Sequence, residues 1–121
     1  AAWRVLEPIG VDEDWFKANR RSQFDLEHHL FYRSEIHAGE SVSTYNRGVG
    51  RSDRRFHGVY LVLNDSTDRL AATLEYITAG IDMGQRRMAA FPPELADGLD
   101  RLIALHERLD WAPPLCGVMS P

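Results

Sequence analysis

Residues 24–37 alternate between two kinds of side chain, and this pattern runs into a tight turn at residues 38–40. One row at period 2 is mostly apolar, and the other is mostly ionisable. The apolar row is Phe24, Leu26, His28, Leu30, Tyr32, Ser34 and Ile36; the ionisable row is Asp25, Glu27, His29, Phe31, Arg33, Glu35 and His37. Such alternation predicts a strand with one buried face. At about 3.3 Å per residue the strand would span roughly 46 Å, so we expect it to bend or coil around something.

Three further strands are predicted, at residues 41–49, 55–63 and 69–82. Polar turn clusters at residues 50–53 and 64–68 separate them. Because the strands follow one another at hairpin spacing, we predict that all four form an antiparallel meander.

Helices are predicted on both sides of the strands. Asp12 is a candidate N-cap for a short helix that would bury Trp15 and Phe16, and Pro92-Pro93 suits the start of a C-terminal helix. The apolar stripe of that second helix is Leu95, Leu99, Leu102, Ile103, His106 and Leu109. Residues 83–90 read as a loop and residues 110–121 as an irregular tail. The prediction is one α+β domain over residues 1–121.

Composition narrows the class of protein. The chain of 121 residues has a net charge of −4, so no basic excess points to nucleic acid as a partner. Cys116 is the single cysteine, which excludes an intrachain disulfide and fits a reducing compartment. No apolar run approaches the roughly 20 residues of a membrane span. We therefore expect a cytoplasmic protein without a membrane partner.

Several short motifs occur in a recognisable order. They are Glu27-x-His29-x-x-Tyr32-x-x-Glu35-x-x-Ala38-Gly39-Glu40, then Leu70-Ala71-Ala72-Thr73-x-Glu75, then Asp82-x-x-x-Arg86-Arg87 and Phe91-Pro92-Pro93. Over residues 11–109 this order resembles the hotdog-fold acyl-CoA thioesterases. Within that superfamily the chain is most similar to the 4-hydroxybenzoyl-CoA thioesterase-like group, including betainyl-CoA thioesterase-like proteins.

The resemblance implies a long antiparallel sheet wrapped around a central helix, in a homodimer or tetramer with its active site at the subunit interface. It also implies hydrolysis of an acyl-CoA thioester without a metal or a cofactor, coenzyme A being part of the substrate. The family usually has a first strand and an Asp-x-Asn-x-His-type segment before the central helix. Residues 1–6 resemble the end of that helix, and we expect the preceding part to be missing from this sequence.

Thioester hydrolysis needs a carboxylate that activates water or attacks the carbonyl, and donors that hold the oxyanion. Glu27 and His29 lie two positions apart on the predicted strand, hence on one face, and are the candidate catalytic pair. The alternative is that both lie on a solvated or dimer-facing surface and pair with arginines. His28 points the other way and is predicted to be packed, while Glu35 is predicted to close a salt bridge.

Candidate binding residues come from three places in the chain. Phe31 and Tyr32, with Thr73 and Glu75, could line the acyl pocket, although core packing or a cross-strand pair explains them equally well. Arg54-Arg55 and Arg86-Arg87 could bind the phosphates of CoA, because guanidinium groups match phosphate oxygens; solvated surface arginines are the alternative. His28 and His29 are adjacent and point apart, and no Cys pair or H-E-x-x-H run exists, so no metal site is expected.

Three functions remain open at this point. The first is acyl-CoA hydrolysis assisted by Glu27 and His29, or by a carboxylate upstream of Ala1. The second is a non-catalytic hotdog module that binds acyl-CoA or another small apolar ligand. The third is a cone-shaped α+β ligand-binding or isomerase domain.

Overall fold

The computed structural model describes residues 6–121, and it confirms the α+β class. The elements in chain order are the 3-10 helix η2 (Glu7–Ile9), α1 (Glu13–Ala18), β1 (Arg21–Tyr32), β2 (Val42–Arg51), β3 (Arg55–Asn64), β4 (Arg69–Asp82), β5 (Arg87–Met88) and α2 (Pro93–Glu107). The predicted helix end at residues 1–6 lies outside the described residues except for Leu6, which is in a turn.

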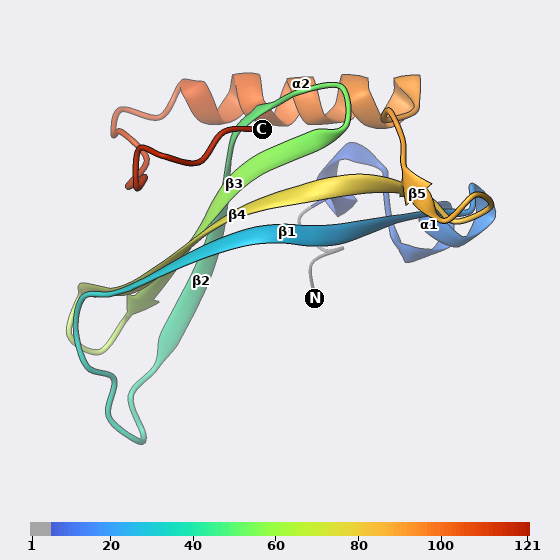
Figure 1. Cartoon of the computed structure of the whole chain (residues 1–121). Helices are drawn as coiled ribbons and strands as arrows, with labels where there is room; N and C mark the ends of the chain where they lie inside the picture. The colour runs from blue at the N-terminus through green and yellow to red at the C-terminus, as the bar shows by residue number, and fades with distance from the viewer. Residues whose placement is uncertain (1–5) are drawn as a thin grey trace.

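The strands form one antiparallel sheet in the order β1-β4-β3-β2, with the short β5 added to β4. β2, β3 and β4 form the predicted meander. The prediction was wrong for β1, which pairs with β4 instead of β2. Residues 33–41 do not form a hairpin turn. They carry the chain around one end of the sheet, so that β1 and β2 lie at opposite edges (Figure 1).

β1 differs from the predicted strand in length and in alternation. It ends at Tyr32, about five residues earlier than predicted. A β-bulge lies at Leu26, because Asp25 pairs with Thr78 while Glu27 pairs with the next residue, Ile77. Since the extra residue reverses the alternation, Asp25 shares a face with His28 and not with Glu27.

The sheet has two distinct faces. We call the core face the one that carries Phe56, Tyr60 and Tyr76 and is covered by the helices. The outer face is the opposite one; it carries His57 and Glu75 and is approached by the C-terminal tail, residues 108–121. Arg47 anchors this tail. Its guanidinium donates to the Trp111 carbonyl and lies over the Trp111 ring, 4.4 Å from the ring centroid.

Both predicted helices are present on the core face. The Asp12 side chain caps α1 by accepting from the Trp15 N–H at 2.8 Å, and Phe16 is buried as predicted. α2 begins at Pro93 and buries Leu95, Leu99 and Leu102. It ends at Glu107, so Leu109, the last residue of the predicted stripe, is exposed beyond the helix. Among the described residues, no helix is long and apolar enough to cross a membrane.

Candidate functional site

A cavity of about 110 Å³ opens on the core face beside the edge of β1 that pairs with no other strand within residues 6–121, and we call it the edge cavity. Its walls come from β1, β3, β4 and the turn before η2. The lining residues are Leu6, Gln23, Asp25, His28, Phe56, Tyr60, Leu74, Tyr76 and Thr78. The cavity therefore combines a largely aromatic floor with two exposed ionisable groups on β1.

The two ionisable groups are Asp25 and His28, and they form a pair. Asp25 Oδ2 lies 3.4 Å from His28 Nε2, with side chains 63% and 48% exposed. The bulge at Leu26 brings them together. On a regular strand, the side chains of two residues three positions apart would point to opposite faces of the sheet. A carboxylate beside an imidazole can take up a proton and be oriented by its neighbour.

Two tyrosines form the polar part of the cavity floor. The rings of Tyr60 and Tyr76 lie 5.2 Å apart, and Asn46 Nδ2 donates to the Tyr76 hydroxyl at 2.8 Å. Burial raises the pKa of Tyr76 far above its ordinary value, against the opposing effect of Asn46. Burial, and then the Asp25 carboxylate, raise the pKa of Tyr60. Both phenols therefore keep their protons at neutral pH and can donate hydrogen bonds.

The predicted catalytic residues Glu27 and His29 lie elsewhere. Both are on the outer face, both are exposed, and neither lines the edge cavity. The sequence missed Asp25 as the carboxylate of this cavity, because a bulge leaves no clear signal in the alternation. His28, predicted to be packed, is half exposed at the cavity rim instead.

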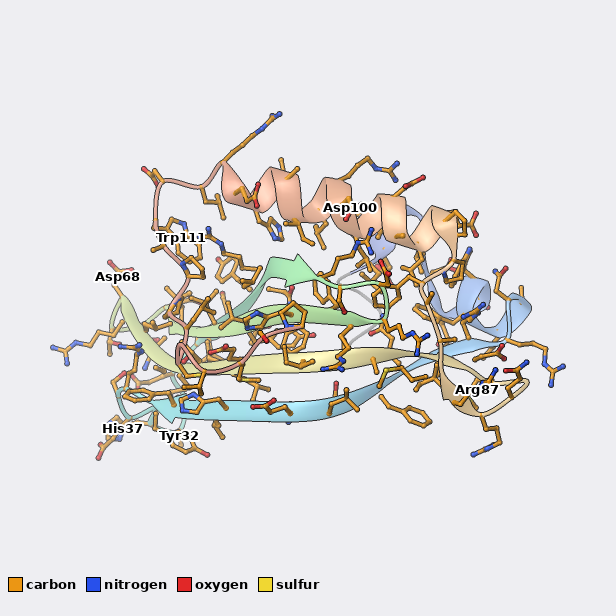
Figure 2. All side chains as sticks on the ribbon, turned by 45° about the horizontal axis from the view of Figure 1, so that its top comes forward. Tyr32, His37, Asp68, Arg87, Asp100 and Trp111 are labelled. Atoms are coloured by element: carbon orange, nitrogen blue, oxygen red, sulfur yellow. The ribbon has the colours of Figure 1, made fainter. Side chains whose placement is uncertain are left out.

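The four predicted acyl-pocket residues do not form one pocket. Phe31 and Thr73 are paired in register on the outer face, and Glu75 lies on the same face, fully buried. Tyr32 is 78% exposed at the end of β1. It lines a separate surface hollow with Ile36 and Ala72, at the end of the sheet opposite to Arg87 (Figure 2).

Glu75 is the centre of a buried polar cluster on the outer face. Its Oε2 lies 2.7 Å from His57 Nε2, and its Oε1 accepts from the Cys116 N–H at 2.7 Å. Burial alone would raise the pKa of Glu75, but the hydrogen bonds from Cys116 and His57 outweigh it and hold the pKa below its ordinary value. His57 carries no signal of this role in the sequence, because 18 residues separate it from Glu75 and only the fold brings the two together.

The four predicted phosphate-binding arginines gather at one end of the sheet. Arg54 and Arg55 lie in or next to the β2–β3 turn, which bonds to β4 through the Arg54 carbonyl and the Gly80 N–H. Arg86 and Arg87 lie at the β4–β5 turn, where Arg87 pairs with Asp82. All four are exposed. Their phosphate role stays a prediction.

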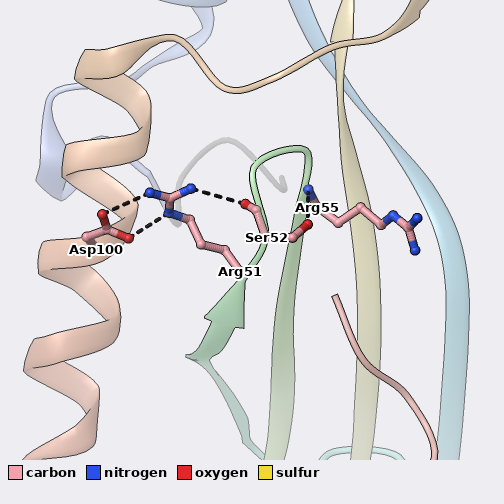
Figure 3. A network of polar contacts seen from close by, with 4 residues as sticks. All are labelled: Arg51, Ser52, Arg55 and Asp100. Carbon is pink, nitrogen blue, oxygen red and sulfur yellow. Dashed lines mark hydrogen bonds and ion pairs between the residues drawn. The ribbon is translucent and has the colours of Figure 1, made fainter.

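Arg51, close to these arginines, is engaged within the protein. It forms two hydrogen bonds to the Asp100 carboxylate, at 2.6 and 2.9 Å, and donates to the Ser52 carbonyl. Figure 3 shows this network between β2 and α2, and it shows the Arg55 side chain extending away from it. Arg55 is therefore available at the surface, whereas the Arg51 guanidinium is engaged by Asp100 of α2.

Comparisons with known proteins identify the family and the fold. Residues 1–99 match the family model of the thioesterase-like superfamily. No curated protein matches the sequence. Among solved structures, the protein SAV2348 from Staphylococcus aureus, described in complex with CoA, has a TM-score of 0.84 at 21% identity; the alignment covers 99% of this chain and 75% of that one.

Two further structures have the same architecture. The 1,4-dihydroxy-2-naphthoyl-CoA thioesterase Slr0204 from Synechocystis aligns with a TM-score of 0.70 and 14% identity, over 84% of this chain and 75% of that one. The probable thioesterase YbaW from Escherichia coli aligns with a TM-score of 0.69 and 14% identity, over 84% and 76% of the two chains. These likenesses confirm the hotdog fold. The match over residues 1–99 shows that the chain belongs to the thioesterase-like superfamily.

Proposed function

We propose that this protein hydrolyses an acyl-CoA thioester to the free acid and CoA, with the acyl group held in the edge cavity. The observation that carries the proposal is the Asp25–His28 pair at the rim of an apolar cavity with a tyrosine floor. Membership in the thioesterase-like superfamily supports the reaction class. The complex of a structural relative with CoA supports the ligand class.

The residues of the edge cavity suggest a division of roles. Asp25 would accept a proton from a water molecule whose oxygen bonds to the thioester carbonyl carbon. His28 would hold the carboxylate in place. Tyr60 or Tyr76 would donate a hydrogen bond to the developing oxyanion. The carbon–sulfur bond then breaks, and the CoA thiolate leaves and takes up a proton.

The position of the arginines supports a substrate that lies along β1, with its thioester at Asp25 and its phosphates at the arginine end of the sheet. Asp25 pairs with Thr78 and Arg21 pairs with Asp82, so the arginine end of the sheet lies about four residues, or roughly 13 Å, along the strand from the carboxylate. The pantetheine arm of CoA separates the thioester from the phosphates. A ligand lying along β1 would reach Arg86 or Arg87 with its phosphates.

A partner subunit would complete the site. β1 is the last strand of the sheet on this side and carries the half-exposed residues Phe24, Leu26, Leu30 and Phe31. An unpaired apolar edge of this kind is suited to pairing with a second chain. We infer a homodimer joined along β1, with the edge cavity at the interface. Enclosure by the partner would remove water from the Asp25–His28 pair.

The runner-up is a module that binds acyl-CoA without hydrolysing it. It is favoured by the exposure of the Asp25 and His28 side chains, which in a single chain are 63% and 48% accessible. A base in open solvent gains little from its surroundings. A measurement of free CoA released from acyl-CoA separates hydrolysis from binding alone.

The test is the release of free CoA from a panel of acyl-CoA esters. We expect Asp25→Asn to lower kcat/KM by about 100-fold or more, the usual size of a general-base contribution. Glu27→Gln is the matched control, because it removes a carboxylate two residues away on the other face, and its kcat/KM should stay within about threefold. Loss of activity in Glu27→Gln with Asp25→Asn unaffected would overturn the assignment. Acyl-CoA binding without CoA release by the wild type would favour the binding module.

A further inference from the structure

Three possible metal ligands meet on the outer face, away from the edge cavity. They are a nitrogen of His29, a carboxylate oxygen of Glu75 and the thiol of Cys116, all within 4.8 Å of one another. His29 and Glu75 are register partners on β1 and β4, and Cys116 comes from the tail. We propose that His29, Glu75 and Cys116 form a zinc site that fastens the C-terminal tail to the outer face of the sheet.

The donor set determines the choice of metal. Imidazole nitrogen, carboxylate oxygen and thiolate sulfur are together the ligands of zinc, whereas Mg²⁺ and Ca²⁺ take oxygen ligands. Tetrahedral zinc holds such donors at about 2.0–2.3 Å, which places neighbouring donors about 3.3–3.8 Å apart. Because the three atoms lie within 4.8 Å of one another, they need to approach by at most about 1.0–1.5 Å. His29 is exposed and can turn its ring, so this closure is small.

Glu75 is already oriented as a ligand would be. It is 2% exposed, and its two oxygens are held by His57 and by the Cys116 N–H. Each carboxylate oxygen keeps a further lone pair for a metal. Carboxylates that bind a metal are themselves hydrogen-bonded by outer residues that orient them. His57 would thus position Glu75 without binding the metal.

The tail is held on both sides of Cys116. Arg47 anchors Trp111 before it, and Met119 after it is 8% exposed. The thiol is therefore kept beside the sheet before any metal arrives, which lowers the entropic cost of closing the site. The zinc would join β1, β4 and the tail, with water in the fourth position. The sequence alone predicts no metal site, because it has no Cys pair or H-E-x-x-H run. His29, Glu75 and Cys116 are at least 41 residues apart along the chain, and only the fold brings them together.

The first test uses Zn²⁺ and Co²⁺ as probes on protein cleared of metal with EDTA. We expect one Zn²⁺ per chain by titration calorimetry. Co²⁺ should give a thiolate-to-cobalt absorption band, and since Cys116 is the single cysteine, Cys116→Ser must abolish it. His29→Asn should weaken zinc binding at least tenfold. The control is His37→Asn, which removes an exposed histidine from the loop after β1 and should leave binding unchanged.

The second test leaves Cys116 intact, so it does not depend on the folding of a cysteine variant. Zinc should slow alkylation of Cys116 at least tenfold in the wild type and much less in His29→Asn. Less than half an equivalent of bound zinc, or equal zinc affinity in wild type and His29→Asn, overturns the proposal. None of these readouts uses thioester hydrolysis, so failure of the proposed function would leave them interpretable.

Discussion

At the scale of single residues, the floor of the edge cavity depends on a glycine. A Cβ at Gly58 would lie 2.4 Å from the Tyr76 hydroxyl, because the Tyr76 ring crosses β3 at this point. We expect Gly58→Ala to lower the free energy of unfolding by about 1–3 kcal/mol, the usual cost of overpacking. Gly50→Ala is the matched control, since a Cβ there meets nothing within 4 Å. Urea unfolding of both variants measures the difference; equal stabilities would mean that the Tyr76 ring is free to move.

Glu75 gives a second prediction at this scale, for metal-free protein. Its pKa lies below the ordinary value of 4.5, so the carboxylate stabilises the fold above that pH and loses this contribution as the pH falls through the folded-state pKa. Wild-type stability should therefore fall more steeply than that of Glu75→Gln below about pH 4.5. At pH 7 the variant should be less stable by about 1–3 kcal/mol, since His57 and Cys116 lose a charged acceptor. Urea unfolding from pH 3 to 7 in EDTA tests both; parallel curves would contradict the role given to the carboxylate.

At the scale of elements, sequence patterns predicted the bounds of those strands and helices that are set by residues close together in the chain. β4 has the predicted bounds, β2 and β3 differ from them by one or two residues, and α2 begins at the predicted proline. Alternation failed for β1, because the bulge at Leu26 and the pairing with β4 depend on contacts distant in sequence. The same bulge places Asp25, and not Glu27, at the edge cavity. The catalytic role predicted for Glu27 and His29 stays a prediction. Pairing order and bulges are properties of the assembled sheet, and a single strand does not encode them.

Two neighbouring residues of α2 attach the helix to the rest of the protein by different kinds of contact, one apolar and one ionic. Leu99 is 1% exposed in the core, whereas Asp100 forms its ion pair with Arg51 at the surface (Figure 3). We expect Leu99→Ala to cost about 2–5 kcal/mol through the lost transfer energy and the cavity left behind. Asp100→Asn should cost no more than about 1 kcal/mol, because an exposed pair is screened by water. Thermal and urea unfolding compare the two; a larger loss in Asp100→Asn would mean that the ion pair holds the helix.

At the scale of the whole molecule, the two faces of the sheet have different occupants. The helices cover the core face, and the tail approaches the outer face. The edge cavity and the Glu75 cluster therefore lie on opposite sides of the same two strands, β1 and β4. β1 contributes Asp25 and His28 to one and His29 to the other. Whatever pairs with the free edge of β1 would influence both sites.

That edge is the basis of the last prediction, the homodimer joined along β1. Leu26 and Leu30 are half exposed on a strand that has β4 on one side, so a charge there should prevent a second chain from pairing. We expect the double variant Leu26→Lys, Leu30→Lys to shift the protein from dimer to monomer in size-exclusion chromatography with light scattering. Leu105→Lys is the control, because Leu105 is 59% exposed on α2 and away from β1. If the edge cavity lies at the interface, CoA release should fall with dissociation and return at high protein concentration. A double variant that stays dimeric, or a monomer with full activity, would contradict the shared site.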